Sequence, residues 1–263
     1  MFKKWIAALA GLAVILSAGC MEMTSTTTVK KDGSGTITAK MLMGPQMAQM
    51  AAMNTGDDGK PVDMLADLRK ELENPSQYGE GVKLVGIKDA KNEAGWTGLE
   101  ATYSFTDVTK LKLGGKKDGE EGGGGPMMEG PEYKIAFTKG ATCKLVMTPE
   151  KRDPPAELTA EEKEAEAAAE AQSEQMAGMM APMLAGMKMQ MFLKVDGKVT
   201  STNVDAGNKL DDGILVMEVL MDQVIKDPKN LGKLEKAAKK GEKIEIPGVK
   251  MLDPTKEIVV EFK

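Results

Sequence analysis

The sequence predicts an α+β fold, in which a mostly antiparallel sheet is packed by one long and several short helices. Two observations lead to this prediction. Segments rich in threonine and valine alternate apolar and polar residues, and glycine-containing turns separate them. A capping-box spacing at Thr159 and Glu162 opens a long stretch rich in alanine and glutamate, which is typical of a helix. We expect one such domain over residues 20–263.

A leader over residues 1–19 comes first. Lys3 and Lys4 supply positive charge, an uninterrupted apolar run covers 5–16, and small residues fill 17–19. This order is typical of a secretory signal peptide. The apolar run is shorter than the roughly 20 residues that a transmembrane helix needs.

The leader ends directly at Cys20, as in bacterial lipoprotein signals. We therefore expect cleavage between Gly19 and Cys20 and lipid attachment at the Cys20 thiol, with acyl chains such as palmitate holding the protein on a membrane. The alternative is an ordinary secretion signal cut near Ala18 or Gly19, because Ser17 stands where leucine is usual. Met21 follows the cysteine, and the absence of aspartate there favours the outer membrane of a cell envelope with two membranes.

The first half of the mature chain predicts two hairpins with helices between them. The expected strands are 24–31, 36–43, 82–89 and 96–105, the expected helices are 46–54 and 61–73, and a single helical turn covers 106–110. A glycine-rich segment over 113–130 predicts a flexible loop, since many glycines cannot offset the entropy of ordering.

The second half predicts a third hairpin, the long helix and a group of strands. The expected strands of the hairpin are 133–138 and 142–147, and the long helix runs over about 159–186. A strand over 187–195 then has 198–203 and 213–220 as expected antiparallel partners. A lysine-rich helix over about 228–240 and a strand over 257–262 follow.

The composition excludes several functions. The chain has no histidine, which removes serine–histidine and cysteine–histidine catalysis and histidine-ligated metal sites. Arg69 and Arg152 are its only arginines and the net charge is −5, so we expect no nucleic-acid binding. No catalytic residue, metal ligand or cofactor site stands out, and we expect a protein that is not an enzyme.

Methionine is the unusual component of the sequence, with 22 residues. Two patterns place methionines on one face of the long helix and of the strand that follows it; they are Met176, Met179, Met180, Met183, Met187, Met189 and Met191. Three interpretations remain open. These side chains can fill an irregular core, line an adaptable pocket for an apolar or lipid ligand, or bind Cu(I) through their thioethers.

Two further features have an ordinary and a functional interpretation. Cys143 lies in a predicted strand and is either a buried small side chain or a reactive thiol, although no histidine is present to activate it. The lysine-rich helix is either a solvated surface helix or a contact with anionic lipid headgroups.

Three segments resemble a known family. They are similar, in the same order, to segments of LppM-type bacterial lipoproteins. The three segments are the hairpin after Cys20, GWTGLEATYSFTDVTKL over 95–111, and KVDGKVTSTN over 194–203 followed by a strand at 213–219. The chain departs from them at 195–197, where Val-Asp-Gly replaces Phe-Pro-Gly, and it has no apolar run for a C-terminal membrane helix after Met221. The resemblance implies a membrane-tethered α+β domain with affinity for lipid or glycolipid, and no catalytic residues.

We therefore expect a membrane-anchored envelope lipoprotein with a non-catalytic binding domain for an apolar or lipid ligand. The alternative is a structural module of the envelope that binds a protein partner, whose identity the sequence does not indicate.

Overall fold

The computed structural model describes residues 21–45, 47, 49, 63–113, 132–150, 181 and 184–263 of the 263-residue chain. The signal peptide over 1–19, the attachment residue Cys20, nearly all of the long helix predicted over 159–186 and nearly all of the glycine-rich segment over 113–130 lie outside these residues.

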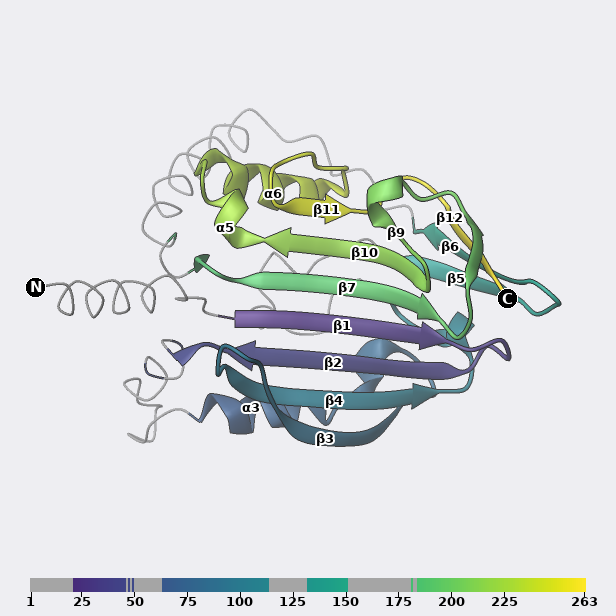
Figure 1. Cartoon of the computed structure of the whole chain (residues 1–263), viewed down its shortest axis with the longest axis horizontal. Helices are drawn as coiled ribbons and strands as arrows, with labels where there is room; N and C mark the ends of the chain where they lie inside the picture. The colour runs from purple at the N-terminus through teal and green to yellow at the C-terminus, as the bar shows by residue number, and fades with distance from the viewer. Residues whose placement is uncertain are drawn as a thin grey trace, which may run out of the picture.

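A large sheet forms the centre of the molecule (Figure 1). Its path has the spatial order β11 (Val249–Met251), β10 (Gly213–Leu220), β7 (Lys188–Val195), β1 (Met21–Val29), β2 (Gly35–Met43), β4 (Thr97–Phe105) and β3 (Lys83–Lys91). The short β9 (Lys209–Leu210) pairs with β10 and completes an eight-stranded sheet.

The first strand of the chain is central in this sheet. β1 pairs antiparallel with β2 along its whole length, as the turn at Asp32 and Gly33 predicts. Its other neighbour is β7, which pairs with it in parallel, so that Glu22 lies opposite Lys188 and Val29 opposite Val195. This parallel pair is an exception in a sheet whose other pairs are antiparallel.

A second sheet has four strands, in the order β5 (Tyr133–Thr138), β6 (Cys143–Pro149), β12 (Ile258–Phe262) and β8 (Val199–Thr202). All its pairs are antiparallel. The prediction that 198–203 pairs with the strand at 187–195 is wrong, because β8 pairs with β12. The prediction for 213–220 is confirmed, since β10 pairs antiparallel with β7.

The helices of the described residues are short. They are α3 (Met64–Leu72), α5 (Met221–Val224) and α6 (Lys229–Lys240), together with the 3-10 turns η1 (Pro75–Tyr78), η2 (Val108–Lys110) and η4 (Ala206–Asn208). Asp63 caps α3 by accepting the Ala66 N–H, and Gly241 ends α6 in the left-handed conformation.

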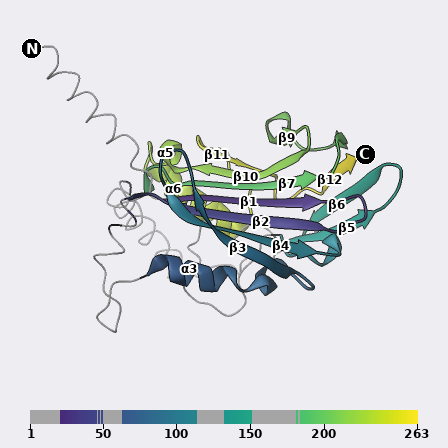
Figure 2. The ribbon, with the colours of Figure 1, turned by 60° about the horizontal axis from the view of Figure 1, so that its bottom comes forward.

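Two hydrophobic clusters pack the helices and the second sheet against the large sheet. The larger cluster joins α3 and the second sheet to the large sheet, through side chains such as Leu72, Tyr103 and Phe262. The smaller cluster joins α5, α6 and Ile244 to β7 and β10. Figure 2 shows α3 beneath the large sheet.

The predicted α+β fold class is therefore wrong, because it gave helices too large a share of the packing. The described residues are mostly strand, arranged as two sheets that pack against each other, and helices do not form the main packing layer. The second sheet supplies much of the larger cluster, the part that the α+β prediction assigned to helices. Periodicity identifies strands but does not assign them to one sheet or two, which explains the error.

Candidate functional site

One face of the large sheet is turned toward the rest of the molecule, and we call it the inner face. On β1 it carries the odd-numbered residues, of which Val29 is fully buried and Thr27 is 4% exposed. The even-numbered residues of β1 point to the opposite, outer face, because side chains alternate along a strand. The pairing register then assigns the residues of the neighbouring strands to either face.

The inner face carries a group of methionines at the end of the sheet where β1 begins. We call this group the methionine face; it comprises Met21, Met23, Met41, Met43, Met189, Met191, Met217 and Met251.

The strand register brings these side chains together. Met23 lies opposite Met41 on one side and Met189 on the other, and Met191 lies opposite Met217. Residues opposite each other on neighbouring strands have Cβ atoms about 5 Å apart, which places their thioethers in contact range.

The methionine face lies between the two hydrophobic clusters. Met189 belongs to the smaller cluster. Leu193, four residues later on the same face of β7, belongs to the larger one. Met191, between them, is half-buried, and so are its neighbours Ser25 and Met217. The methionine face is thus partly accessible in the described part of the structure.

Charged groups are absent from the inner positions of the three central strands. β1 contributes methionine, serine, threonine and valine there, while β2 and β7 contribute only glycine and apolar residues. Within the described residues, no group of three or more Asp, Glu, His or Cys side chains converges as a metal site would require. On these three strands the face therefore presents mostly apolar contact surface, and it carries no carboxylate, amine or imidazole that could act as a general base.

The outer face of the same sheet carries a row of polar side chains beside apolar ones such as Leu42 and Phe192. One register row crosses the path from β3 to β11 and comprises Lys88, Glu100, Lys40, Thr24, Gln190, Glu218 and Lys250. Gln190 Nε2 donates to Glu218 at 2.6 Å, and Lys250 Nζ approaches Glu218 at 3.2 Å. Burial raises the pKa of Glu218, but the hydrogen bonds from Gln190 and Lys250 outweigh it, so this pKa is lowered overall.

The lysine-rich helix is a surface helix whose apolar side packs inward. Leu234 is buried in the smaller cluster, and Leu231 and Ala237 pack against it. This packing agrees with the ordinary interpretation of a surface helix, and contact of its lysines with anionic headgroups stays a prediction. A shallow pocket of about 300 Å³ lies between α6 and 242–246. Its lining combines lysines and glutamates with Ala237, Ile244 and Ile246, and it includes no residue of the methionine face.

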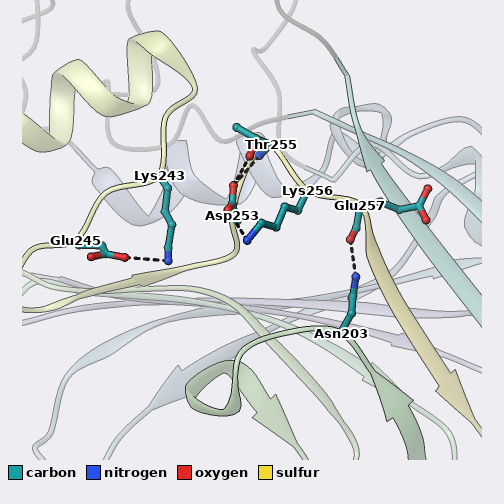
Figure 3. A network of polar contacts seen from close by, with 7 residues as sticks. All are labelled: Asn203, Lys243, Glu245, Asp253, Thr255, Lys256 and Glu257. Atoms are coloured by element: carbon teal, nitrogen blue, oxygen red, sulfur yellow. Dashed lines mark hydrogen bonds and ion pairs between the residues drawn. The ribbon is translucent and has the colours of Figure 1, made fainter.

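A network of polar contacts follows α6 in the chain (Figure 3). Lys243 pairs with Glu245 at 2.9 Å, and Asp253 accepts hydrogen bonds from Thr255. Asn203 Nδ2 donates to the carbonyl oxygen of Glu257 at 2.8 Å, which fastens the segment after β8 to β12. The Lys243–Glu245 pair lies in the loop between α6 and β11, whereas the contacts of Asp253 and Asn203 organise segments next to β12.

Cys143 is a buried thiol of β6, as its ordinary interpretation predicts. It is 1% exposed, and its Sγ lies 3.5 Å from the carbonyl oxygen of Lys31 and 3.7 Å from that of Gly140. Tyr133, at the opposite end of the β5–β6 hairpin, is also buried, which raises its pKa to about 12.

The predicted site residues divide into two groups. Met187, Met189 and Met191 lie along one side of β7 and its N-terminal approach, as the alternation predicts, and Met187 and Met189 contribute to the smaller cluster. Outside the described residues lie Gly19, Cys20, Met176, Met179, Met180 and Met183.

The remaining methionine-face residues, on β1, β2, β10 and β11, were not among the predicted site residues. The expected first strand began at residue 24, which left out Met21 and Met23. Their alternation directly after Cys20 was an available signal. The short β11 was not expected at all, and its Met251 reaches the group only because β11 pairs with β10.

Comparisons with known proteins give little further information. No known family model and no curated protein matches the sequence. Among solved structures, the chain is similar to the NMR structure of the folded domain of LppM from Mycobacterium tuberculosis, with a TM-score of 0.31 and 8% sequence identity over 93% of this chain and 90% of that chain. This is a distant structural resemblance only. In the part of the chain that the structure describes, no helix has the length and apolar character needed to span a membrane.

Proposed function

We propose that this protein is an exported lipoprotein, anchored to an envelope membrane through Cys20, whose β-rich domain binds an apolar or lipid ligand without catalysing a reaction. The anchor rests on the leader, in which a charged start, an apolar run and small residues end at Cys20. Binding rests on the methionine face.

The observation that supports binding most directly is the half-buried state of Met191 and Met217 between two closed clusters. Well-packed cores bury such side chains fully, whereas a binding face leaves them partly exposed until a ligand covers them. Methionine suits this role because its unbranched, polarisable side chain adapts to ligands of irregular shape. An acyl chain placed there would gain about 0.8 kcal/mol for each methylene group removed from water.

Binding can be tested by native mass spectrometry of the full-length protein after gentle extraction from its membrane. We expect a bound lipid in addition to the mass of the acyl anchor. A mass that corresponds to the acylated protein alone, under several growth conditions, would contradict the proposal.

Adjacent residues of β1 provide a matched pair of variants. Ser25→Glu places a carboxylate among the methionines, next to Met191, and should abolish ligand retention. Thr26→Glu places the same group on the outer face, one residue further along the strand, and should leave retention unchanged. Equal loss in both variants would indicate a general effect on folding and would contradict a site on the inner face.

The anchor has its own test. The Cys20→Ser variant should leave the membrane fraction and lack the mass of the diacylglyceryl group, since the thiol that carries it is gone. Retention of this variant on membranes would show that another feature holds the protein there. Crosslinking in membranes separates a ligand-binding domain from a structural module. One constant crosslinked protein partner would favour the structural module.

A further inference from the structure

The large sheet begins at the residue directly after the proposed attachment site. β1 starts at Met21, whose Cα is about 3.8 Å from that of Cys20 across one peptide bond. Met21 already pairs with Met43, and Glu22 pairs with Lys188. An acyl group on Cys20 would therefore attach to the end of a sheet strand, with no linker that lets the domain turn away from the bilayer.

The turn between β3 and β4 lies at this same end of the sheet. Thr97, the first residue of β4, pairs with Met43, which in turn pairs with Met21. Asn92 Nδ2 donates to Glu22 Oε2 at 3.4 Å, so the turn contacts the second residue of β1 directly. Figure 1 shows this turn and the start of β1 at one end of the molecule.

The turn holds Trp96 in a defined position. The Trp96 N–H donates to Asn92 Oδ1 at 3.0 Å, and the Asn92 N–H donates to the carbonyl oxygen of Trp96 at 3.1 Å. Gly95 closes the turn with a φ of 81°, a conformation that favours glycine. Trp96 is half-buried beside exposed Ala94 and Gly95. A partly exposed indole is the side chain that proteins place most often at a membrane–water interface.

The first turn of α3 points toward the same end. Arg69 in the last turn of the helix pairs with Asp89 at 3.0 Å, and Asp89 lies opposite Leu99 near the start of β4. Leu65 lies one turn before Arg69 and is 38% exposed, which is unusual for a leucine of this structure. A second partly exposed apolar side chain thus lies in the first turn of α3, at the same end of the molecule.

We infer that the end of the large sheet that carries Trp96 and Leu65 rests on the bilayer interface when the chain is tethered at residue 20. This inference rests on the lipid anchor of the proposed function and specifies which surface faces the membrane. Lys91 and Glu93 flank the turn with opposite charges, so the contact should not depend on anionic lipid. The apolar side of the lysine-rich α6 is buried in the smaller cluster, so a contact of that helix with the bilayer would depend on its lysines and on anionic lipid.

Tryptophan fluorescence provides the test, because the chain has two tryptophans and one of them, Trp5, belongs to the leader. The acylated full-length protein is reconstituted into phosphatidylcholine vesicles with brominated acyl chains, which quench a nearby indole. In parallel, the leaderless chain is coupled through Cys20 to a maleimide lipid in the same vesicles. Cys143 is 1% exposed and should not compete for the maleimide.

We expect a blue shift of the Trp96 emission on vesicle binding, a partial loss of emission with brominated lipid, and protection from iodide. The matched control moves the reporter to the opposite end of the sheet by combining Trp96→Phe with Thr138→Trp. Thr138 is exposed in the β5–β6 hairpin, whose Phe137 approaches Gly33 of the β1–β2 turn. The reporter at position 138 should show no lipid quenching and full iodide quenching.

Each outcome decides between the two proposals. Quenching at position 96 in the maleimide-tethered chain, with no vesicle binding by the cell-derived protein, would contradict the Cys20 acyl anchor. It would still support the proposal that the Trp96 end of the sheet contacts the bilayer. If iodide quenches the Trp96 emission of the tethered chain fully and brominated lipid does not quench it, the proposed contact surface is wrong. Quenching that appears only after anionic lipid is added would also overturn it, since it would assign the contact to lysines.

Discussion

The Tyr103 hydroxyl donates a hydrogen bond of 2.6 Å to the carbonyl oxygen of Leu72, and this contact ties the end of α3 to the middle of β4. Tyr103 is fully buried, and its ring lies 4.6 Å from that of Tyr78. The contact positions α3 on the inner face beside the methionine face. It also satisfies one of the carbonyl groups that a helix leaves unpaired at its C-terminus.

Tyr103→Phe should lower the free energy of unfolding by about 1–3 kcal/mol, because the Leu72 carbonyl oxygen stays buried without a donor. Urea denaturation followed by circular dichroism measures this change. Thr102→Val, the neighbouring position on the outer face of β4, is the matched control and should change stability by less than about 0.5 kcal/mol. Equal effects at the two positions would show that the hydrogen bond is unimportant.

Three aspartates in turns should make the protein less stable in acid. Asp32, Asp107 and Asp253 each accept hydrogen bonds from the side chain and the backbone of a Ser or Thr two residues later, and these bonds lower the pKa of each carboxyl below 3.8. A lowered pKa in the folded state adds stability above the unfolded value, and this stability is lost as the pH falls through the folded value.

The triple variant with Asn at these positions should therefore lose less stability between pH 5 and about pH 2 than the unmodified protein. Asparagine keeps an acceptor oxygen for the turn but does not titrate in this range. Thermal unfolding at a series of pH values tests the expectation. Parallel curves for the two proteins would show that other carboxyl groups control the acid sensitivity.

The polar row of the outer face should contribute to stability mainly through Glu218. Its side chain is 14% exposed, whereas Glu100 of the same row is 23% exposed and its partner Lys88 is 71% exposed. Glu218→Gln should cost about 1 kcal/mol, since it weakens a charge-assisted hydrogen bond and an ion pair. Lys88→Gln should cost less than about 0.5 kcal/mol. Denaturation at low and high salt should show a larger salt dependence for the unmodified protein than for Glu218→Gln.

Two glycines of the β3–β4 hairpin should respond in opposite ways to alanine. A Cβ at Gly98 would collide with the carbonyl oxygen of Met41 and lie 2.9 Å from the Leu42 Cα, whereas a Cβ at Gly86 would meet nothing within 4 Å. Gly98→Ala should destabilise the protein by about 2 kcal/mol, because β2 and β4 must separate. Gly86→Ala should be neutral or stabilise by about 0.5 kcal/mol. Chemical denaturation of the two variants side by side tests both expectations.

Local sequence signals located most of the described elements but not their assembly. The alternation over 96–105 and the turn at Gly95 predict β4 and its hairpin almost to the residue. Strand pairing depends on contacts distant in sequence, so neither the parallel β1–β7 pair nor the β8–β12 pair could be read from periodicity.

The methionine face was predictable only in part for the same reason. Alternation puts Met189 and Met191 on one side of a strand, and it does the same for Met41 and Met43. Only the strand order brings these two pairs together, with β1 between them. Met251 could not be anticipated, because a three-residue strand carries too little pattern to be recognised.

The position of β1 also sets the order in which this protein can fold. Glu22, at the start of the chain's first strand, finds its β7 neighbour only at Lys188, so the centre of the sheet is closed by contacts of very long sequence separation. Such topologies fold slowly, because distant loops must close before their contacts can stabilise them. During synthesis from the amino terminus, the β1–β2 hairpin would emerge first and keep an unpaired edge until β7 arrives. A holding chaperone that shields open strand edges is therefore expected to raise the yield of folded protein more than a catalyst of isomerisation does.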